Sequence, residues 1–319
     1  MKKITALLLA LLMLVGVLTG CGKQNDTNKT DKLSIVTTIF PEYDWVREIL
    51  GDKADSAEIT MLLDNGVDLH SYQPTADDII KLSDCDLFVY VGGESDEWVE
   101  DALKSAANRD RKVINLLEIL GDSVKEEETV EGMQEEEEDH EEKEYDEHVW
   151  LSLKNAKTLV GAISAALQEL DPDNKDTYAA NTSAYIEKLS ALDGEYQSAV
   201  DGAARKTVLF GDRFPFRYLV DDYGLSYYAA FAGCSAESEA SFETVSFLAR
   251  KVDEGKLPCV LTIEGKNHKI AETIVQNTAG KNQKILTMDS MQSTTSQDVA
   301  TTYLSLMAKN LDVLKEALG

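Results

Sequence analysis

The chain contains only four histidines, His70, His140, His148 and His268. Imidazole changes charge near neutral pH and is the side chain that binds divalent metals most often in proteins. His70 lies in the segment 67–75, between a predicted strand and a predicted helix, so its ring can face a crevice. His148 lies where a long acidic segment ends and helical sequence begins. Each histidine taken alone also fits an ordinary surface position, or a core position where its ring nitrogens are hydrogen-bonded. Whether these histidines can bind a metal together therefore depends on the strands and helices that position them.

Short apolar runs alternate with helical patterns along both halves of the chain. The runs at 33–39, 57–63, 87–91 and 112–117 predict strands, with helices at 43–50, 76–82 and 97–107. The second half repeats this order, with strands at 206–210, 225–231, 259–263 and 284–288 and helices at 216–223, 242–252, 269–277 and 299–318. Such alternation predicts an α/β fold of two doubly wound lobes with parallel sheets.

One long helix is predicted between the two lobes. Segment 174–203 contains no proline and places apolar residues at Tyr185, Ile186, Leu189 and Leu192. We expect an N-terminal lobe at 33–172, a rigid linking helix at 173–204 and a C-terminal lobe at 205–319. Ligands of such sheets bind beyond the carboxyl ends of the strands, which here is the cleft between the lobes.

The first residues resemble a bacterial export signal. A short basic start precedes an almost unbroken apolar run at 4–18, too short to span a bilayer comfortably. Residues 18–21, Leu-Thr-Gly-Cys, resemble a lipobox, which implies a signal peptide at 1–20 and a diacylglycerol carried by Cys21. The alternatives are an uncleaved anchor and an ordinary secretory signal. We expect a lipid-anchored protein at the extracellular face of the membrane, with a flexible tether at 21–32.

The chain is strongly acidic, with 31 Lys and Arg against 58 Asp and Glu in 319 residues, a formal charge of −27. Such a surface repels nucleic acid and anionic lipid and favours cations as partners. Segment 122–147 alone carries 15 acidic residues and two lysines, and we expect a disordered insertion there. It is either a solubilising loop or a weak collector of divalent cations, with His140 as an occasional ligand.

Besides Cys21 the chain has three cysteines, Cys85, Cys234 and Cys259. An odd number in an oxidising compartment is not a disulfide framework, although a Cys234–Cys259 bridge can be drawn. Because there is no C-x-x-C pair, the sequence does not predict a thiolate metal site.

Four motifs resemble one known family, the metal-binding lipoproteins of bacterial zinc and manganese ABC importers (cluster A-I). The motifs are Thr-Thr-Ile-Phe-Pro at 37–41, Asp-Leu-His-Ser-Tyr-Gln-Pro-Thr at 68–75, Asp-Leu-Phe-Val-Tyr-Val-Gly-Gly at 86–93 and His-Val-Trp-Leu at 148–151. The resemblance covers nearly all of 33–318. It implies two lobes joined by a rigid helix, a metal ion between them and a loop rich in His or acidic residues before the second ligand. His70 and His148 match the first two family ligands.

The resemblance implies two further ligands from the C-terminal lobe, where this chain departs from the pattern. Zinc members place a third His after the first strand of that lobe and manganese members a Glu, whereas this chain has Gly-Asp-Arg-Phe-Pro at 211–215. Asp212 can stand in, or pair with Arg213. His268 follows another strand and can supply the missing imidazole, close to Glu264, which matches a family glutamate. Asp289 matches the position of the family carboxylate, although an Asp there also suits a turn.

The predicted ligand set is therefore His70, His148, His268 and Asp289, which favours Zn²⁺; replacing His268 by Asp212 would favour Mn²⁺. The resemblance implies an extracellular solute-binding lipoprotein, not an enzyme, that captures the ion and delivers it to an ABC permease. A tethered metal-dependent hydrolase would need an open metal position and a base such as Glu264, and no H-E-x-x-H motif supports it. An adhesin with incidental metal is the third alternative.

Overall fold

The computed structural model describes residues 32–319, except 135–143, 236–238, 266 and 299. The predicted signal peptide, Cys21, His140 and the centre of the acidic segment lie outside the described residues. Contacts along the chain separate Met1–Lys32 from Leu33–Gly319. The predicted domain limits within it, 33–172, 173–204 and 205–319, stay predictions.

The N-terminal sheet has four parallel strands in the order β2-β1-β3-β4. They are β1 (Ser34–Thr37), β2 (Glu58–Met61), β3 (Leu87–Tyr90) and β4 (Lys112–Asn115). β3 is inside the sheet, and Leu87, Phe88 and Val89 are fully buried, as expected for a parallel strand covered on both faces. All carboxyl ends of the strands lie at one edge, where the connections to the helices begin.

The C-terminal sheet repeats this arrangement in the order β6-β5-β7-β8, again with all strands parallel. Its strands are β5 (Thr207–Arg213), β6 (Ser226–Phe231), β7 (Cys259–Ile263) and β8 (Lys284–Met288). Every residue of β7 is buried. The predicted fold class, two α/β lobes with parallel sheets, is confirmed.

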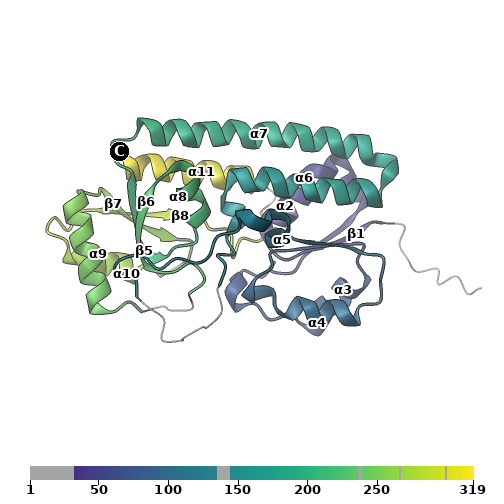
Figure 1. Ribbon diagram of the computed structural model, residues 1–319, viewed down its shortest axis with the longest axis horizontal. Coiled ribbons are helices and arrows are strands. Elements are labelled where there is room, and N and C mark those ends of the chain that lie inside the picture. The colour runs from purple at the N-terminus through teal and green to yellow at the C-terminus, as the bar shows by residue number, and fades with distance from the viewer. Residues whose placement is uncertain (1–31, 135–143, 236–238, 266, 299) are drawn as a thin grey trace, which may run out of the picture. The chain divides into compact units, whose positions relative to one another are not determined.

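Helices cover the sheets and form a layer of their own above them (Figure 1). In chain order they are α2 (Phe40–Leu50), α3 (Ala76–Asp84), α4 (Trp98–Ser105), α5 (Leu116–Leu120), α6 (Leu153–Leu170), α7 (Lys175–Gly202), α8 (Arg217–Tyr223), α9 (Phe242–Gly255), α10 (Lys269–Asn277) and α11 (Tyr303–Leu318). Short 3₁₀ turns join several of them, among them η3 (Leu69–Ser71) and η6 (Val149–Leu151).

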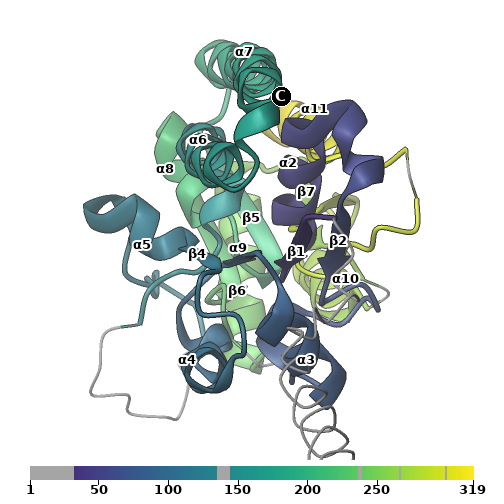
Figure 2. The same cartoon turned by 90° about the vertical axis from the view of Figure 1, so that its right-hand side faces the viewer.

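The long helix α7 connects the two lobes, as predicted. It has 28 residues and packs against α6, α2 and α11. Figure 1 shows α7 running past both sheets. Figure 2 looks roughly along the axis of α7 and shows α6, α11 and α2 lying below it. Its buried residues recur every three or four positions, which makes one continuous apolar face: Tyr178, Thr182, Tyr185, Leu189, Leu192, Tyr196 and Val200. This packing holds the lobes together along the length of the helix.

Two helix starts differ from the prediction because side chains cap them. Helix α2 begins at Phe40, before the predicted start at 43, because the Glu42 carboxylate accepts hydrogen bonds from the backbone N–H groups of Thr38 and Ile39. Helix α11 begins at Tyr303 rather than 299, where the Thr302 hydroxyl accepts from a backbone N–H of the first turn.

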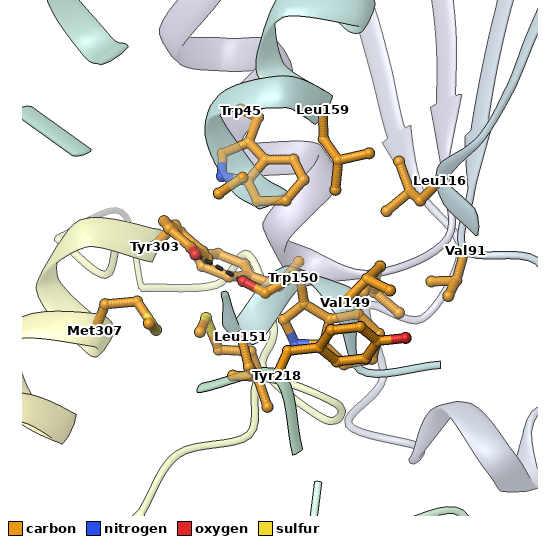
Figure 3. Packing of buried hydrophobic residues seen from close by; sticks show 14 of the residues in the cluster. Trp45, Val91, Leu116, Val149, Trp150, Leu151, Leu159, Tyr218, Tyr303 and Met307 are labelled. Carbon is orange, nitrogen blue, oxygen red and sulfur yellow. Dashed lines mark hydrogen bonds between the residues drawn. The ribbon is translucent and has the colours of Figure 1, made fainter. Parts of the chain in front are cut away.

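A buried cluster of aromatic residues joins the region of His148 to the C-terminal part of the chain (Figure 3). The Tyr303 hydroxyl donates to the Trp150 carbonyl at 2.6 Å, and the Trp150 indole N–H donates to the Ser290 carbonyl at 2.8 Å. Trp45 packs edge-on against the Tyr303 ring, with centroids 5.2 Å apart. Because Trp150 is completely buried and bonded at both ends, the backbone just after His148 has little freedom.

Within the described residues, none of the helices combines the length and the apolar character that crossing a membrane would require. Cys85, Cys234 and Cys259 are free thiols, so the bridge between Cys234 and Cys259 considered above is not formed.

Candidate metal centre

His70 is held at the carboxyl edge of the N-terminal sheet by a capped turn. It is the middle residue of η3, and the Asp68 side chain accepts a hydrogen bond from the His70 backbone N–H at 3.1 Å. Leu69 is fully buried and anchors the turn in the core. The ring Nδ1 lies 2.8 Å from the Ser95 hydroxyl, in the segment that follows β3. With Nδ1 engaged there, Nε2 is the atom left for a ligand.

His148 is completely buried, and Asp146 fixes its ring. One oxygen of Asp146, Oδ1, accepts from both the backbone N–H and the ring Nδ1 of His148, each at 2.9 Å. A carboxylate can only accept, so Nδ1 carries the proton and Nε2 of the neutral ring carries the lone pair. Metal-binding histidines are oriented by carboxylates in this manner.

The two Nε2 atoms face each other across 3.1 Å. Two lone pairs at this distance need a shared proton or a cation between them. Two ligand nitrogens on a tetrahedral Zn²⁺, with bonds of about 2.0–2.1 Å, lie roughly 3.3 Å apart. The spacing of His70 and His148 therefore matches that of two ligands of one metal ion.

A third atom of a type that can bind a metal, the sulfur of Cys234, lies close to these two nitrogens. The ligand atoms of His70, His148 and Cys234 all lie within 4.8 Å of one another, and no other such group of three His, Cys, Asp or Glu occurs among the described residues. Cys234 follows β6, so it belongs to the C-terminal sheet, whereas both histidines belong to the N-terminal half. The sequence did not point to Cys234 because it contains no C-x-x-C pair, which is the usual mark of a thiolate metal site. The signal that was available is the position of Cys234 just after a strand of the second sheet.

Asp212 and Arg213 are committed to contacts within the protein. The two Asp212 carboxylate oxygens accept from the backbone N–H groups of Arg213, at 2.9 Å, and Ile263, at 3.3 Å. The Arg213 guanidinium pairs with the Asp68 carboxylate at 2.6 Å. Asp212 lies outside the group of three, and burial raises its pKa.

The other predicted ligands, His268 and Asp289, also lie outside that group. Asp289 accepts from the Met291 backbone N–H at 2.9 Å and so shapes the turn after β8. Glu264 accepts from both the N–H and the hydroxyl of Ser290, each at 2.6 Å. His268 precedes α10, and its Nδ1 is buried with no hydrogen-bond partner in the part of the chain that is described. Their role as ligands stays a prediction.

The two rings lie among buried ionisable groups that shift one another's pKa values. Burial and then the neighbouring His148 lower the pKa of His70 to about 3, so its ring is neutral at physiological pH. Burial also acts to lower the pKa of His148, but the Asp146 charge outweighs it and the pKa is raised. Burial raises the pKa of Glu147 to about 7; its Oε2 lies 3.5 Å from Nδ1 of His70. Burial, and then the nearby acidic groups, raise the pKa of the Cys234 thiol.

A cavity of about 340 Å³ opens beside His70, lined among others by Asp68, Arg213, Ser235 and Glu264. Its lining comes from the turn that holds His70 and from the carboxyl ends of β5, β6 and β7, which is where ligands of parallel sheets enter.

Comparison with known proteins matches this architecture to one family. The family model described as zinc-uptake complex component A, periplasmic, matches residues 35–317. The chain belongs to this ZnuA family. It is 33% identical to the zinc-binding lipoprotein AdcA of Streptococcus pneumoniae over 324 residues, 99% of this chain and 61% of that relative. It is 32% identical to the high-affinity zinc uptake system protein ZnuA of Bacillus subtilis, covering 93% of this chain and 91% of the relative. The chain thus spans less than two thirds of the length of AdcA.

Solved structures of the ZnuA family share the fold. The Zn(II)-bound ZnuA-like domain of S. pneumoniae AdcA matches with a TM-score of 0.70 and 31% identity, covering 90% of this chain and 99% of that domain. The metal-dependent lipoprotein YcdH of B. subtilis matches with a TM-score of 0.72 and 30% identity, with 90% and 99% covered. The resemblance read from the motifs is therefore confirmed at the level of the family.

Proposed function

We propose that this chain is the solute-binding protein of an ABC importer and that its solute is Zn²⁺, bound between His70 and His148. The observation that carries the proposal is the separation of 3.1 Å between the two Nε2 atoms, each on a ring whose Nδ1 is occupied by a partner. Such a site needs no covalent chemistry. The ion would lie between the two Nε2 atoms, the His70 ring would carry its proton on Nδ1, next to the Ser95 hydroxyl, and the ion would leave again unchanged. Membership of a family with zinc-binding members supports zinc over manganese.

Binding is tested by titrating zinc into the metal-free protein in competition with a chromogenic chelator. We expect one ion per chain in the wild type and loss of this stoichiometric site in His70→Ala and in His148→Ala. A full equivalent of tightly bound zinc in both variants would contradict the proposed site. His268→Ala and Asp289→Asn, measured in parallel, test the remaining predicted ligands.

We further propose that the protein is lipid-anchored through Cys21 at the outer face of the cell membrane and passes its ion to a membrane permease. The lipobox-like residues 18–21 support the anchor, and the AdcA relative carries the name lipoprotein. Cys21→Ser should move the protein from the membrane fraction to the soluble fraction. A strain that lacks the gene should grow poorly when zinc is scarce, and the wild-type gene, but not His148→Ala, should restore growth. Equal growth with either gene would contradict a role in zinc uptake.

A further inference from the structure

We propose that the Cys234 thiolate is the metal ligand contributed by the C-terminal lobe, taking the place of the third imidazole that zinc members of the family use. This rests on the proposed function, since it names a further donor of the same site. Its direct support is that the sulfur and the two imidazoles form the one three-donor group of the described residues. The donors come from both sheets, so the ion would join the lobes.

The backbone around Cys234 is built to hold the sulfur against the histidines. The Cys234 N–H donates to Oε1 of Glu127 at 2.9 Å. Gly233 lies so close to the His148 ring that an added Cβ would meet its Cε1 at 3.0 Å and the Phe214 carbonyl oxygen at 2.9 Å. Because only a glycine lets the backbone come this close to the His148 ring, the next residue, Cys234, lies beside the two imidazoles.

The segment that supplies the third ligand elsewhere in the family is occupied here by a cation. Arg213 extends into the cavity beside His70 and pairs there with Asp68 at 2.6 Å. The Asp68 carboxylate balances the Arg213 charge, and the two imidazoles are neutral ligands, so neither brings a negative charge into direct contact with the ion. An anionic sulfur would supply one. The oxygens of the rival donor Asp212 already accept two backbone hydrogen bonds.

Binding through Cys234 proceeds by exchange of a proton for the metal. The S–H bond breaks, the proton leaves to solvent, and the sulfur lone pair forms the bond to Zn²⁺, which keeps its oxidation state. With Zn–S near 2.3 Å and Zn–N near 2.0–2.1 Å, tetrahedral geometry sets sulfur and nitrogen roughly 3.6 Å apart. The three donor atoms all lie within 4.8 Å of one another, so the movement needed to bring them to these distances is roughly 1 Å at most. Thiolate is a ligand that Zn²⁺ accepts well, whereas Mn²⁺ prefers oxygen.

The test is zinc K-edge X-ray absorption of the full-length protein loaded with one equivalent of zinc. We expect one sulfur scatterer near 2.3 Å with nitrogen and oxygen near 2.0–2.2 Å. In Cys234→Ser the sulfur shell should vanish, while Cys85→Ser should keep it. A shell of nitrogen and oxygen alone in the wild type, with one zinc bound, would overturn the role of Cys234 and leave the proposed function standing. If no zinc binds, both fail.

Metal affinities of the variants distinguish a Cys234 thiolate that binds the ion from a Cys234 thiol that only supports the fold. Cys234→Ser should weaken zinc binding by more than about 100-fold, beyond the 10–100-fold that loss of an outer-shell partner costs. Its effect on Mn²⁺ should be smaller, because a hydroxyl suits that ion. Cys85→Ser, at a buried free thiol outside the group of three, should stay within a few-fold of the wild type. Equal losses for both metals, or loss in His268→Ala with none in Cys234→Ser, would overturn the assignment.

Discussion

Replacing Asp146 by Asn tests whether the His148 ring is oriented by its carboxylate. Asp146 is 2% exposed, and its Oδ1 accepts both the backbone N–H and the ring Nδ1 of His148. Asn keeps the shape and one acceptor but removes the charge that makes the imidazole a better donor. Loss of such a partner costs 10–100-fold in metal affinity, or about 1.4–2.8 kcal/mol. Because this carboxylate is buried and little screened by salt, we expect the upper end of that range.

The assay is chelator competition for zinc at neutral pH, with the melting temperature of each metal-free variant as a check on folding. Asp253→Asn is the matched control, since it removes the same charge from a carboxylate that also accepts a backbone N–H, that of Ala279. The control should bind zinc like the wild type. If Asp146→Asn stayed within threefold of the wild type, the orientation of His148 by Asp146 would be refuted. Equal losses in both variants would point to net charge instead.

Three further predictions concern stability. Gly194→Ala, at an exposed position of α7 with no atom within 4 Å of the added Cβ, should stabilise the protein by about 0.5–1 kcal/mol in urea unfolding; a loss of stability would mean that α7 is strained there. Burial raises the pKa of Asp44 from 3.8 to about 6, so the folded state binds its proton more tightly and this residue's contribution to stability falls as pH rises. Relative to Asp44→Asn, the unfolding free energy of the wild type should fall by about 2 kcal/mol between pH 4 and 7. If the difference between the two proteins did not change with pH, the pKa of Asp44 would not be raised in the folded state. Chelation of the metal should lower the unfolding free energy, and zinc at 100 times its Kd should restore about 2.7 kcal/mol; no change would argue against binding to the folded state.

The fold was predictable because burial leaves a strong pattern in parallel sheets. The continuous apolar run at 87–91 predicted a buried strand, observed as β3, and the apolar residues spaced along 174–203 predicted the connecting helix, observed as α7. Helix starts were less accurate, since they depend on capping contacts. For example, α2 begins as early as Phe40 because the Glu42 carboxylate accepts a hydrogen bond from the Thr38 backbone N–H.

The sequence singled out His70 and His148, whose Nε2 atoms lie 3.1 Å apart in the structure, but it did not single out Cys234, which lies with them in one group of possible metal donors. His70 and His148 are rare residues at connections that follow strands or precede helices, so their types and places both carried information. The donor from the other lobe depends on which loop of the second sheet reaches the histidines. That is decided by contacts far apart in sequence, such as those of Gly233 with His148 and of Cys234 with Glu127.

A crystal structure of the zinc-soaked protein, with anomalous diffraction recorded at the zinc edge, tests most directly whether one ion joins the two lobes. We predict a single strong peak about 2.0–2.1 Å from Nε2 of both His70 and His148, with the next donor supplied by the segment after β6. A peak bound to neither imidazole, or no peak at full zinc loading, would contradict the account.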